Sequence, residues 1–421
     1  MLFKRVTIFL SMLAFIYTIA FGIFLTDLVR IPAPLIFGLL PLFFATSPLS
    51  GFAYHKELIL SSLALFLYCI VGNNDFKSFG ASMITITSCL CYFNYFVGTS
   101  GFRYRLSIAI FVCLLATSMV LMLFDHFDAN LIDPIRELSV GEPVKQSPSG
   151  IATTQFTFGY QLAAFCTFSV VGVVSHRRSI FIIIAVCLFC LLCMFFGMNR
   201  SAFLVFFVTT GLFIIGYYRW KAIAIIGLIL LLSIGIYQVI LKENINNKNN
   251  ILSKNQAKQA NDFNRATMSI ENLKIMAEYP YGLIFYGKTW KQATYRNPLF
   301  VDGLSSHNAY LMFITYLGPF IGLGLLAAIY LHIFKLFWSN LRMIKRRKYA
   351  LFTSILFSFI AVSLNAFSHN GWLLSVDGPT LFLYIAILHY HKVYFTKKTV
   401  PIGNESVQKL KPNIKFFAFT K

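Results

Sequence analysis

Long apolar runs, each followed by a short polar break, repeat along most of the chain. A helix needs about 20 mostly apolar residues to cross the hydrocarbon core of a membrane, so runs of this length indicate spanning helices. One run is short, and two are separated only by the sequence MNR. We predict an all-α transmembrane bundle of about twelve spans, near residues 6–25, 31–48, 57–73, 79–98, 106–124, 156–174, 179–198, 201–218, 222–241, 318–337, 350–367 and 378–394.

The composition supports this prediction. The chain is 57% hydrophobic and only 12% charged, with a mean hydropathy of +0.70, far from the balance of a soluble domain. The net charge of +21 is compatible with nucleic-acid binding, but most Lys and Arg residues lie in short loops between apolar runs. Membrane topology accounts for that placement, because basic loops stay in the cytoplasm. We therefore expect an integral membrane protein with no nucleic-acid partner.

The basic residues also predict the orientation of the chain. With the N-terminus inside, the short outer loops hold little beyond Arg30, Lys77 and Arg200. Both termini are then cytoplasmic, and the Lys-bearing tail at 396–421 lies free or on the membrane surface. The inner loops hold Lys56, Arg103, Arg105, Arg177, Arg178, Arg219, Lys221, Arg342, Lys345, Arg346, Arg347 and Lys348.

Two outer segments are longer than ordinary connections, near 125–155 and at 242–306. The larger one opens with a polar Asn/Lys stretch and continues as a weakly amphipathic helix that ends at Pro280. A turn-rich sequence, YGLIFYGKTW, follows. Residues 1–241 then hold spans one to nine, 242–306 form a large outer loop with short helices, and 307–395 hold the last three spans. The apolar positions of the loop helix are Met268, Leu273, Ile275 and Met276.

The cysteines and the N-terminus add no separate chemistry. All eight cysteines lie in apolar runs without nearby His or carboxylate residues, so we interpret them as small buried groups with no disulfide framework. Lys4 and Arg5 precede an apolar stretch that is too long for an ordinary signal peptide, so we interpret it as the first span. We find no metal-ligand spacing, no phosphate-binding Gly loop and no nucleophile elbow, and we expect no metal and no cofactor.

His307 and Asn308 lie at the outer mouth of the tenth predicted span, in the sequence SSHNAYLMFITYLGPF. A neutral imidazole accepts a proton near neutral pH, which suits a general base in a half-wet cleft. A helix cap bonded to backbone or headgroups is the structural alternative, and position alone favours it. His369 and Asn370 form a second His-Asn pair on the same side, near Asp377. They can line the same cleft, although we favour a tight polar turn.

Two arginines stand out as candidate anion ligands. Arg200, in FFGMNRSAFLVFF, has almost no polar sequence around it, and a charge near membrane depth marks a functional site with a partner. Its guanidinium can grip phosphate oxygens, or it can extend to the lipid headgroups from a turn. Arg265 opens the loop helix, where a cation opposes the helix dipole. That misfit favours an external anion, although a surface role is the simpler alternative. His389 and His391 lie near the inner end of the last span and are expected to be interfacial.

Several of these segments resemble one family. The segment HNAYLMFITYLG, with His307-Asn308, nine residues and Gly318, is similar to the His-Asn-x(9)-Gly motif of the O-antigen ligase and polymerase superfamily. The preceding NRATMSIENLKIMAEYPYGLIFYG resembles the family's Arg, amphipathic segment, Pro and Gly-rich turn, although PYGLIFYG departs from its Pro-x-x-Gly-x-Gly form. MNRSAFL is similar to its Arg-Ser/Gly-Ala segment, and GIATTQFTFGYQLAAF is a looser match.

The resemblance implies a metal-independent glycosyltransferase of the bacterial inner membrane. Such enzymes pass a glycan from a polyprenyl diphosphate to a sugar hydroxyl at the periplasmic face. It implies His307 as the base, with Arg200 and Arg265 at the departing diphosphate. Asn308 and His369 are further substrate-binding candidates. Transfer with inversion, by a single in-line displacement, is a hypothesis.

Three functions remain open at this point. A ligase would attach the finished polymer to lipid A-core, and we favour it slightly on the twelve-span plan and the His-Asn motif. A polymerase would join repeat units on the carrier lipid, in some systems with a chain-length regulator as partner. A transporter of the lipid-linked glycan is the third possibility. The scarcity of charge within the spans and the absence of an evident inverted repeat speak against it.

Overall fold

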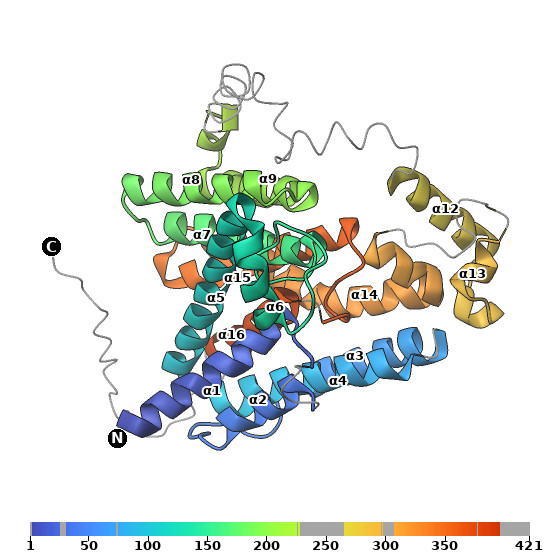
Figure 1. Cartoon of the computed structure of the whole chain (residues 1–421), viewed down its shortest axis with the longest axis horizontal. Helices are drawn as coiled ribbons and strands as arrows, with labels where there is room; N and C mark the ends of the chain where they lie inside the picture. Colours follow the sequence, from blue (N-terminus) through green and yellow to red (C-terminus); the bar gives the residue numbers. More distant parts are fainter. Residues whose placement is uncertain are drawn as a thin grey trace, which may run out of the picture.

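The computed structural model describes residues 2–25, 31–72, 75–224, 226–227, 265–295, 297, 307–376 and 378–395. Every regular element in these residues is a helix, which confirms the predicted all-α class. Several long helices run roughly side by side (Figure 1), with the start of α1 (Leu2–Phe21) at one end of the bundle. Helices α12 (Arg265–Glu278) and α13 (Trp290–Ala293) lie at the opposite end.

Seven helical segments of the described part are long and apolar enough to cross a membrane, so the protein is a helical membrane protein. The shorter apolar helices α2 (Ala33–Leu42) and α8 (Ile180–Phe196) lie between them in the chain. The total of about twelve spans stays a prediction, since most of 222–241 lies outside the described residues. The seven segments are Phe3–Phe21, Phe76–Val97, Gly101–Phe127, Gln155–Ser175, Arg200–Tyr218, Ala309–Met343 and Arg347–Ser368.

The centre of the bundle is formed by α7 (Gln155–Ser175), α15 (Ala350–Asn365) and α16 (Pro379–Tyr390). α16 is apolar on all sides and buried from Pro379 to His389, the pattern of a helix enclosed by others. α7 and α15 pack along each other, and Ser358 Oγ donates a hydrogen bond of 2.8 Å to the Ala164 carbonyl. By contrast, α8 buries only Cys190, Cys193 and Met194, as expected of a helix that faces lipid.

The other helices surround this centre. α3 (His55–Leu65) with the π-helix η1 (Phe66–Gly72) and α4 (Phe76–Cys91) with the π-helix η2 (Tyr92–Val97) form one flank. α5 (Gly101–Phe127), α6 (Ala129–Val140) and α9 (Arg200–Tyr218) follow in the chain. The remaining elements are η4 (Leu283–Tyr286), α14 (Ala309–Met343), η6 (Arg347–Tyr349), η7 (Ala366–Ser368) and η8 (His391–Phe395).

α14 is two helical arms that fold back on each other. Gly318 has φ 79° and ψ 158°, which is not helical, and Pro319 follows it. In a straight helix the twenty positions from Tyr310 to Tyr330 would span about 30 Å, yet the two hydroxyls lie 3.0 Å apart. The short arm (residues 309–317) therefore runs back along the long arm (residues 319–343). His307 precedes the short arm, so the fold places it beside the bundle rather than at the tip of a continuous span.

The loop helix α12 packs against the short arm. Met268 and Ile275 are buried in a cluster with Tyr316, and Thr315 Oγ1 donates a hydrogen bond of 2.6 Å to Asn272 Oδ1. These contacts fall on one helix face, at spacings of four and three residues. The predicted apolar position Leu273 points the other way and is 54% exposed.

Two glycines make the closest contact between this loop and the break in α14. Gly282 has φ 98°, and a methyl group added to it would lie 2.2 Å from the Gly318 nitrogen. A methyl group added to Gly318 would lie 2.2 Å from the Tyr281 carbonyl oxygen. The two backbones therefore touch here, and no side chain larger than hydrogen fits at Gly282 or at Gly318.

We expect Gly282→Ala and Gly318→Ala each to destabilise the protein by roughly 1–3 kcal/mol, the usual cost of overpacking, with further strain from the positive φ. Gly287→Ala is the matched control, because Gly287 also has a positive φ of 58° but nothing within 4 Å of the added methyl. The melting temperature of the purified variants in detergent measures the difference. Equal losses in Gly282→Ala and Gly287→Ala would show that the backbone contact contributes nothing.

The segment near 125–155 is organised around one buried arginine. Arg136 is fully buried, and its Nη1 lies 2.6 Å from both Asp125 Oδ2 and Asp133 Oδ1. Its Nε donates to the Gly150 carbonyl at 2.8 Å. Its remaining bonds go to Ser147 Oγ, Ser149 Oγ and the carbonyls of Gln146 and Ala152. The planar fork of the guanidinium thus fixes the chain that leads into α7.

Arg136→Lys should destabilise this segment, because one ammonium cannot reach the same set of acceptors and Asp125 would stay buried with a poorer partner. We expect faster limited proteolysis within 141–154 and a lower melting temperature. Arg177→Lys is the control, since Arg177 is exposed and its guanidinium makes one bond, to the Lys345 carbonyl at 3.1 Å. Unchanged proteolysis of the Arg136 variant would contradict this role.

The structure agrees with some of the other predictions about single residues and differs from others. Cys113 is exposed on α5 rather than buried, whereas Cys69, Cys89, Cys166, Cys190 and Cys193 are buried as expected. His389, predicted to lie at the membrane interface, is buried within the protein: it is 1% exposed, and its Nδ1 lies 2.7 Å from the Tyr54 hydroxyl. The Asn/Lys stretch at the start of the large loop, Arg30, Asp377 and the tail at 396–421 lie outside the described residues.

Candidate functional site

The starts of three helices meet around the loop that joins α15 to α16. Asn199, before α9, donates from Nδ2 to the Gln155 carbonyl at the start of α7, at 2.7 Å. Ser201 Oγ, in the first turn of α9, lies 2.6 Å from His369 Nε2 in the loop. The first N–H of α14, from Ala309, donates to the His369 carbonyl at 2.9 Å. These bonds join four segments that are far apart in sequence into one site.

α9 and α14 begin in the same way. Met198 and His307 both have positive φ angles, 49° and 48°, although neither is glycine. Each is followed by an asparagine N-cap whose side chain accepts from an N–H three residues on: Asn199 from Ala202, and Asn308 from Leu311. A left-handed residue other than glycine costs about 1–3 kcal/mol, and such residues gather at functional sites. The two strained starts therefore mark this region for attention.

Both candidate histidines lie against one aromatic ring. The Phe156 ring stacks on His307 at 5.9 Å between centroids and meets His369 edge-on at 5.3 Å. His369 is 3% exposed and also contacts the Tyr160 ring at 5.8 Å, whereas His307 is half-buried and Phe156 is exposed. The structure thus brings together the two His-Asn pairs that the sequence shows separately. His307 is the more accessible of the two imidazoles.

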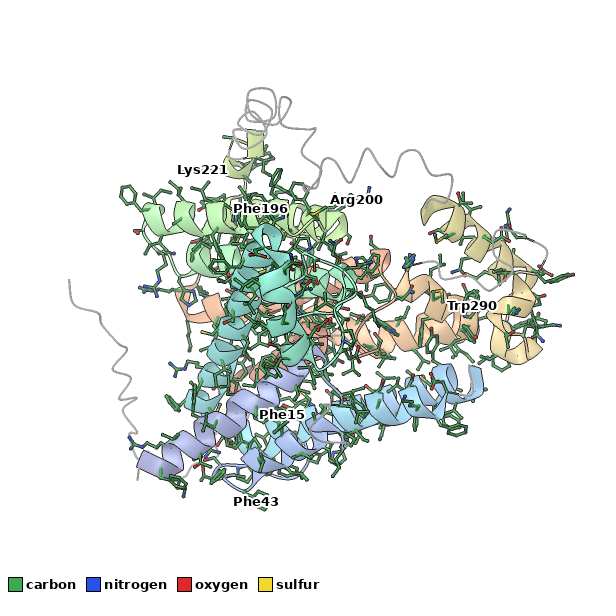
Figure 2. All side chains as sticks on the ribbon, in the orientation of Figure 1. Phe15, Phe43, Phe196, Arg200, Lys221 and Trp290 are labelled. Atoms are coloured by element: carbon green, nitrogen blue, oxygen red, sulfur yellow. The ribbon has the colours of Figure 1, made fainter. Side chains whose placement is uncertain are left out.

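Arg200 occupies the first position of α9, next to Ser201, and is half-buried. In Figure 2 it lies at the end of α9 on the side of the molecule that carries Trp290 of α13. Residues 155–224 and 307–376, which include the site helices, contain no Asp or Glu, and Asp377 at the end of the loop lies outside the described residues. Three helix N-termini and one guanidinium therefore favour an anion at this site.

The structure gives less detail about the other predicted site residues. Asn308 Oδ1 caps α14 through the Leu311 N–H at 3.1 Å, so a structural role is established for it. Arg265 begins α12, which lies on the side of the molecule toward which the Arg200 end of α9 points (Figures 1 and 2), but its side chain lies outside the described residues. Asn370 is exposed beside His369.

Asn365, four residues before His369, is a buried polar residue that sequence analysis missed. It is fully buried, and neither its amide oxygen nor its nitrogen has a partner among the described residues. It lies two turns after Ser358 on the face of α15 that meets α7, close along the chain to His369. A buried amide without partners needs an explanation, such as a bound water or ligand.

The sequence gives a recognisable signal for only one of the other site residues. Asn199 can be predicted as an N-cap ahead of an apolar run. Nothing in the sequence marks Ser201, Phe156 or Tyr160 as neighbours of His369, which is at least 168 positions away. The described residues contain no group of three or more His, Cys, Asp or Glu side chains that could hold a metal ion. A metal-free reaction stays a prediction.

Comparison with known proteins gives no assignment: no family model matches the chain, and no curated protein matches it.

The Asn199 amide is the contact on which the start of α9 depends, and Gly159 leaves room for it. A methyl group at Gly159 would lie 2.3 Å from Asn199 Nδ2. We expect Asn199→Ala to cost about 1 kcal/mol or more through the lost cap. Gly159→Ala should cost a similar amount, and the double variant less than the sum, because both changes break one contact.

Thermal or denaturant unfolding of the four proteins of this cycle measures the coupling. Gly172→Ala, in the same helix, is the control, because its added methyl meets only Ser354 Oγ at 3.4 Å. Strict additivity of Asn199→Ala and Gly159→Ala would disprove the coupling.

Proposed function

We propose that the protein is a membrane enzyme that transfers a glycan from a polyprenyl diphosphate to the hydroxyl of an acceptor sugar. The observation that carries the proposal is the meeting of His307 and His369 at three helix N-termini, with Arg200 next to the Ser201 that bonds to His369. Such a region favours a multiply charged anion. The sequence resemblance to the O-antigen ligase and polymerase superfamily narrows that anion to the diphosphate of a lipid carrier.

The chemistry needs help at two atoms. The acceptor hydroxyl is a weak nucleophile, and His307 takes its proton as the oxygen attacks the anomeric carbon. The bond from that carbon to the diphosphate breaks in the same step, which inverts the anomeric configuration. The departing diphosphate carries the released charge, and Arg200, Arg265 and the helix N-termini stabilise it. The reaction requires no cofactor, because the diphosphate of the donor is itself the leaving group.

The placement of charge supports a site at the periplasmic face of the bacterial inner membrane. Arg200 lies at the end of α9 that is nearer to α12 and α13, and the start of α1 lies on the other side of the molecule (Figures 1 and 2). Lys4 and Arg5 near that start, and the basic loops at 176–178 and 342–348, favour the cytoplasm for the opposite end. A lipid-linked donor can approach from the bilayer, and the acceptor from the periplasm.

Ligase and polymerase use the same donor chemistry and differ in the acceptor. A ligase transfers the chain to lipid A-core, and a polymerase transfers it to another carrier-linked glycan. We retain a slight preference for the ligase. The glycan profile of a deletion strain separates the two, because loss of a ligase leaves full-length unligated polymer and loss of a polymerase leaves single repeats.

We expect His307→Ala to reduce transfer by roughly 10²- to 10⁴-fold, the usual contribution of a general base. Arg200→Ala and Arg265→Ala should each reduce it by roughly 10²- to 10³-fold, as for a preorganised charge donor at a leaving group. Arg265→Lys should recover little, because an ammonium cannot bind two phosphate oxygens as a guanidinium does. The measurement is transfer of labelled glycan by purified protein in detergent.

Matched controls test whether position matters. Arg178→Ala removes an exposed guanidinium from the α7–α8 turn at the other end of α7, and Lys274→Ala removes an exposed cation from α12 itself. Both should transfer normally. Activity without a membrane gradient would exclude a transporter, whereas wild-type rates in all three alanine variants would refute the site.

A further inference from the structure

One buried imidazole holds the site together. His369 bonds to α9 through Nε2 and Ser201 Oγ, at 2.6 Å, and to α14 through its carbonyl and the Ala309 N–H, at 2.9 Å. Its ring contacts Phe156 and Tyr160 of α7, and the Tyr160 hydroxyl donates to the Gly371 carbonyl in the same loop. Among the described residues, these contacts connect all three helix starts through a single side chain and its peptide.

The hydrogen-bond network assigns the protons of this pair. Asn199 Nδ2 donates to the Gln155 carbonyl, so the orientation of the amide is fixed and Oδ1 is an acceptor. Oδ1 accepts from the Ala202 N–H at 3.0 Å and from the Ser201 hydroxyl at 2.8 Å. A serine has one hydroxyl proton. Since that proton goes to Asn199, Ser201 Oγ accepts from His369, and Nε2 carries the hydrogen.

The direction of the hydrogen bond from His369 to Ser201 decides between two possible roles for these two residues. In a nucleophilic Ser-His pair, the imidazole accepts the serine proton through an unprotonated nitrogen. Here the imidazole donates to the serine, and the serine donates away from it. Ser201 is therefore not activated for attack, and the bond acts as a support for the first turn of α9, in which Arg200 is the neighbouring residue.

We propose that His369 is a positioning residue, which holds Arg200 in place for the diphosphate through Ser201. The inference rests on the proposed function and gives the second imidazole a role different from that of His307. His307 touches the reacting hydroxyl, whereas His369 acts on the donor through another side chain. It predicts that the donating Nε2–H, and not the basicity of the ring, is what the reaction needs from position 369.

The test compares substitutions at the two histidines. His369→Gln keeps an N–H donor near the place of Nε2, and His369→Ala and Ser201→Ala each remove the bond. We expect the two alanine variants to raise KM for the lipid-linked donor about tenfold, as expected for a lost hydrogen bond that orients a charged group. Their kcat and the pH profile should stay close to wild type, and His369→Gln should restore most of the KM. His307→Gln should instead lose kcat.

A buried histidine elsewhere controls for loss of packing. His389→Ala removes an equally buried imidazole, bonded to the Tyr54 hydroxyl. It should lower the melting temperature without changing KM. If His369→Gln is as inactive as His369→Ala, or its pH profile moves, His369 takes part in the chemistry and the inference is wrong. An unchanged KM in His369→Ala would also overturn it.

Direct binding separates this inference from the proposed function. Undecaprenyl diphosphate without a glycan, added to purified protein, should raise the melting temperature of the wild type and raise that of His369→Ala much less at the same concentration. An equal rise in both proteins would overturn the role of His369 alone. No rise in the wild type would overturn the proposed function, and this inference with it.

Discussion

The N–H groups in the first turn of a helix have no partner within the helix, and inside a membrane protein each of them must be paired in another way. The site is a consequence of that constraint. Asn199 and Asn308 satisfy one such group each, in α9 and α14, and Thr154 does so for α7. Because the three helix starts meet, the groups that remain give one region of positive potential. The His369 carbonyl pairs one more of them, at Ala309.

The shape of α14 brings His307 to this region. If the helix were straight, residue 307 would lie beyond the tip of a continuous span. The break at Gly318 turns the short arm back along the bundle, and the backbone contact with Gly282 ties the large loop to that break. The segment from His307 to Gly318 therefore has a structural interpretation. His307 and Asn308 at its start belong to the site, and Gly318 at its end sets the direction of the short arm that follows them. The glycine pair links the fold of the loop to the geometry of the imidazole.

Apolar run length predicted the helical membrane class, because burial in lipid acts on every residue of a span. It did not predict the folded α14, since the contact of Gly282 with Gly318 depends on a loop that returns to the helix. His307, His369 and Arg200 could each be chosen from local sequence, as polar groups at the ends of apolar runs. Their meeting at Phe156 and Ser201 could not, because it depends on the packing of α7, α9 and α15. The prediction that Leu273 packs inward was wrong for a simpler reason. Met268, Asn272 and Ile275 define the buried face of α12, and Leu273 lies on another face.

The distribution of charge is the physical basis on which we propose a lipid-linked diphosphate as the ligand. A guanidinium near membrane depth is costly, and proteins usually offset the cost with a carboxylate partner. Asp125 and Asp133 do this for Arg136, which is thereby committed to structure. α9, which begins at Arg200, contains no carboxylate, and the helix dipoles at the site add positive potential. An anionic ligand that enters from the bilayer lowers this electrostatic cost. Binding energy of that kind grows as negative charge develops on the leaving group, which is the condition for it to accelerate a reaction.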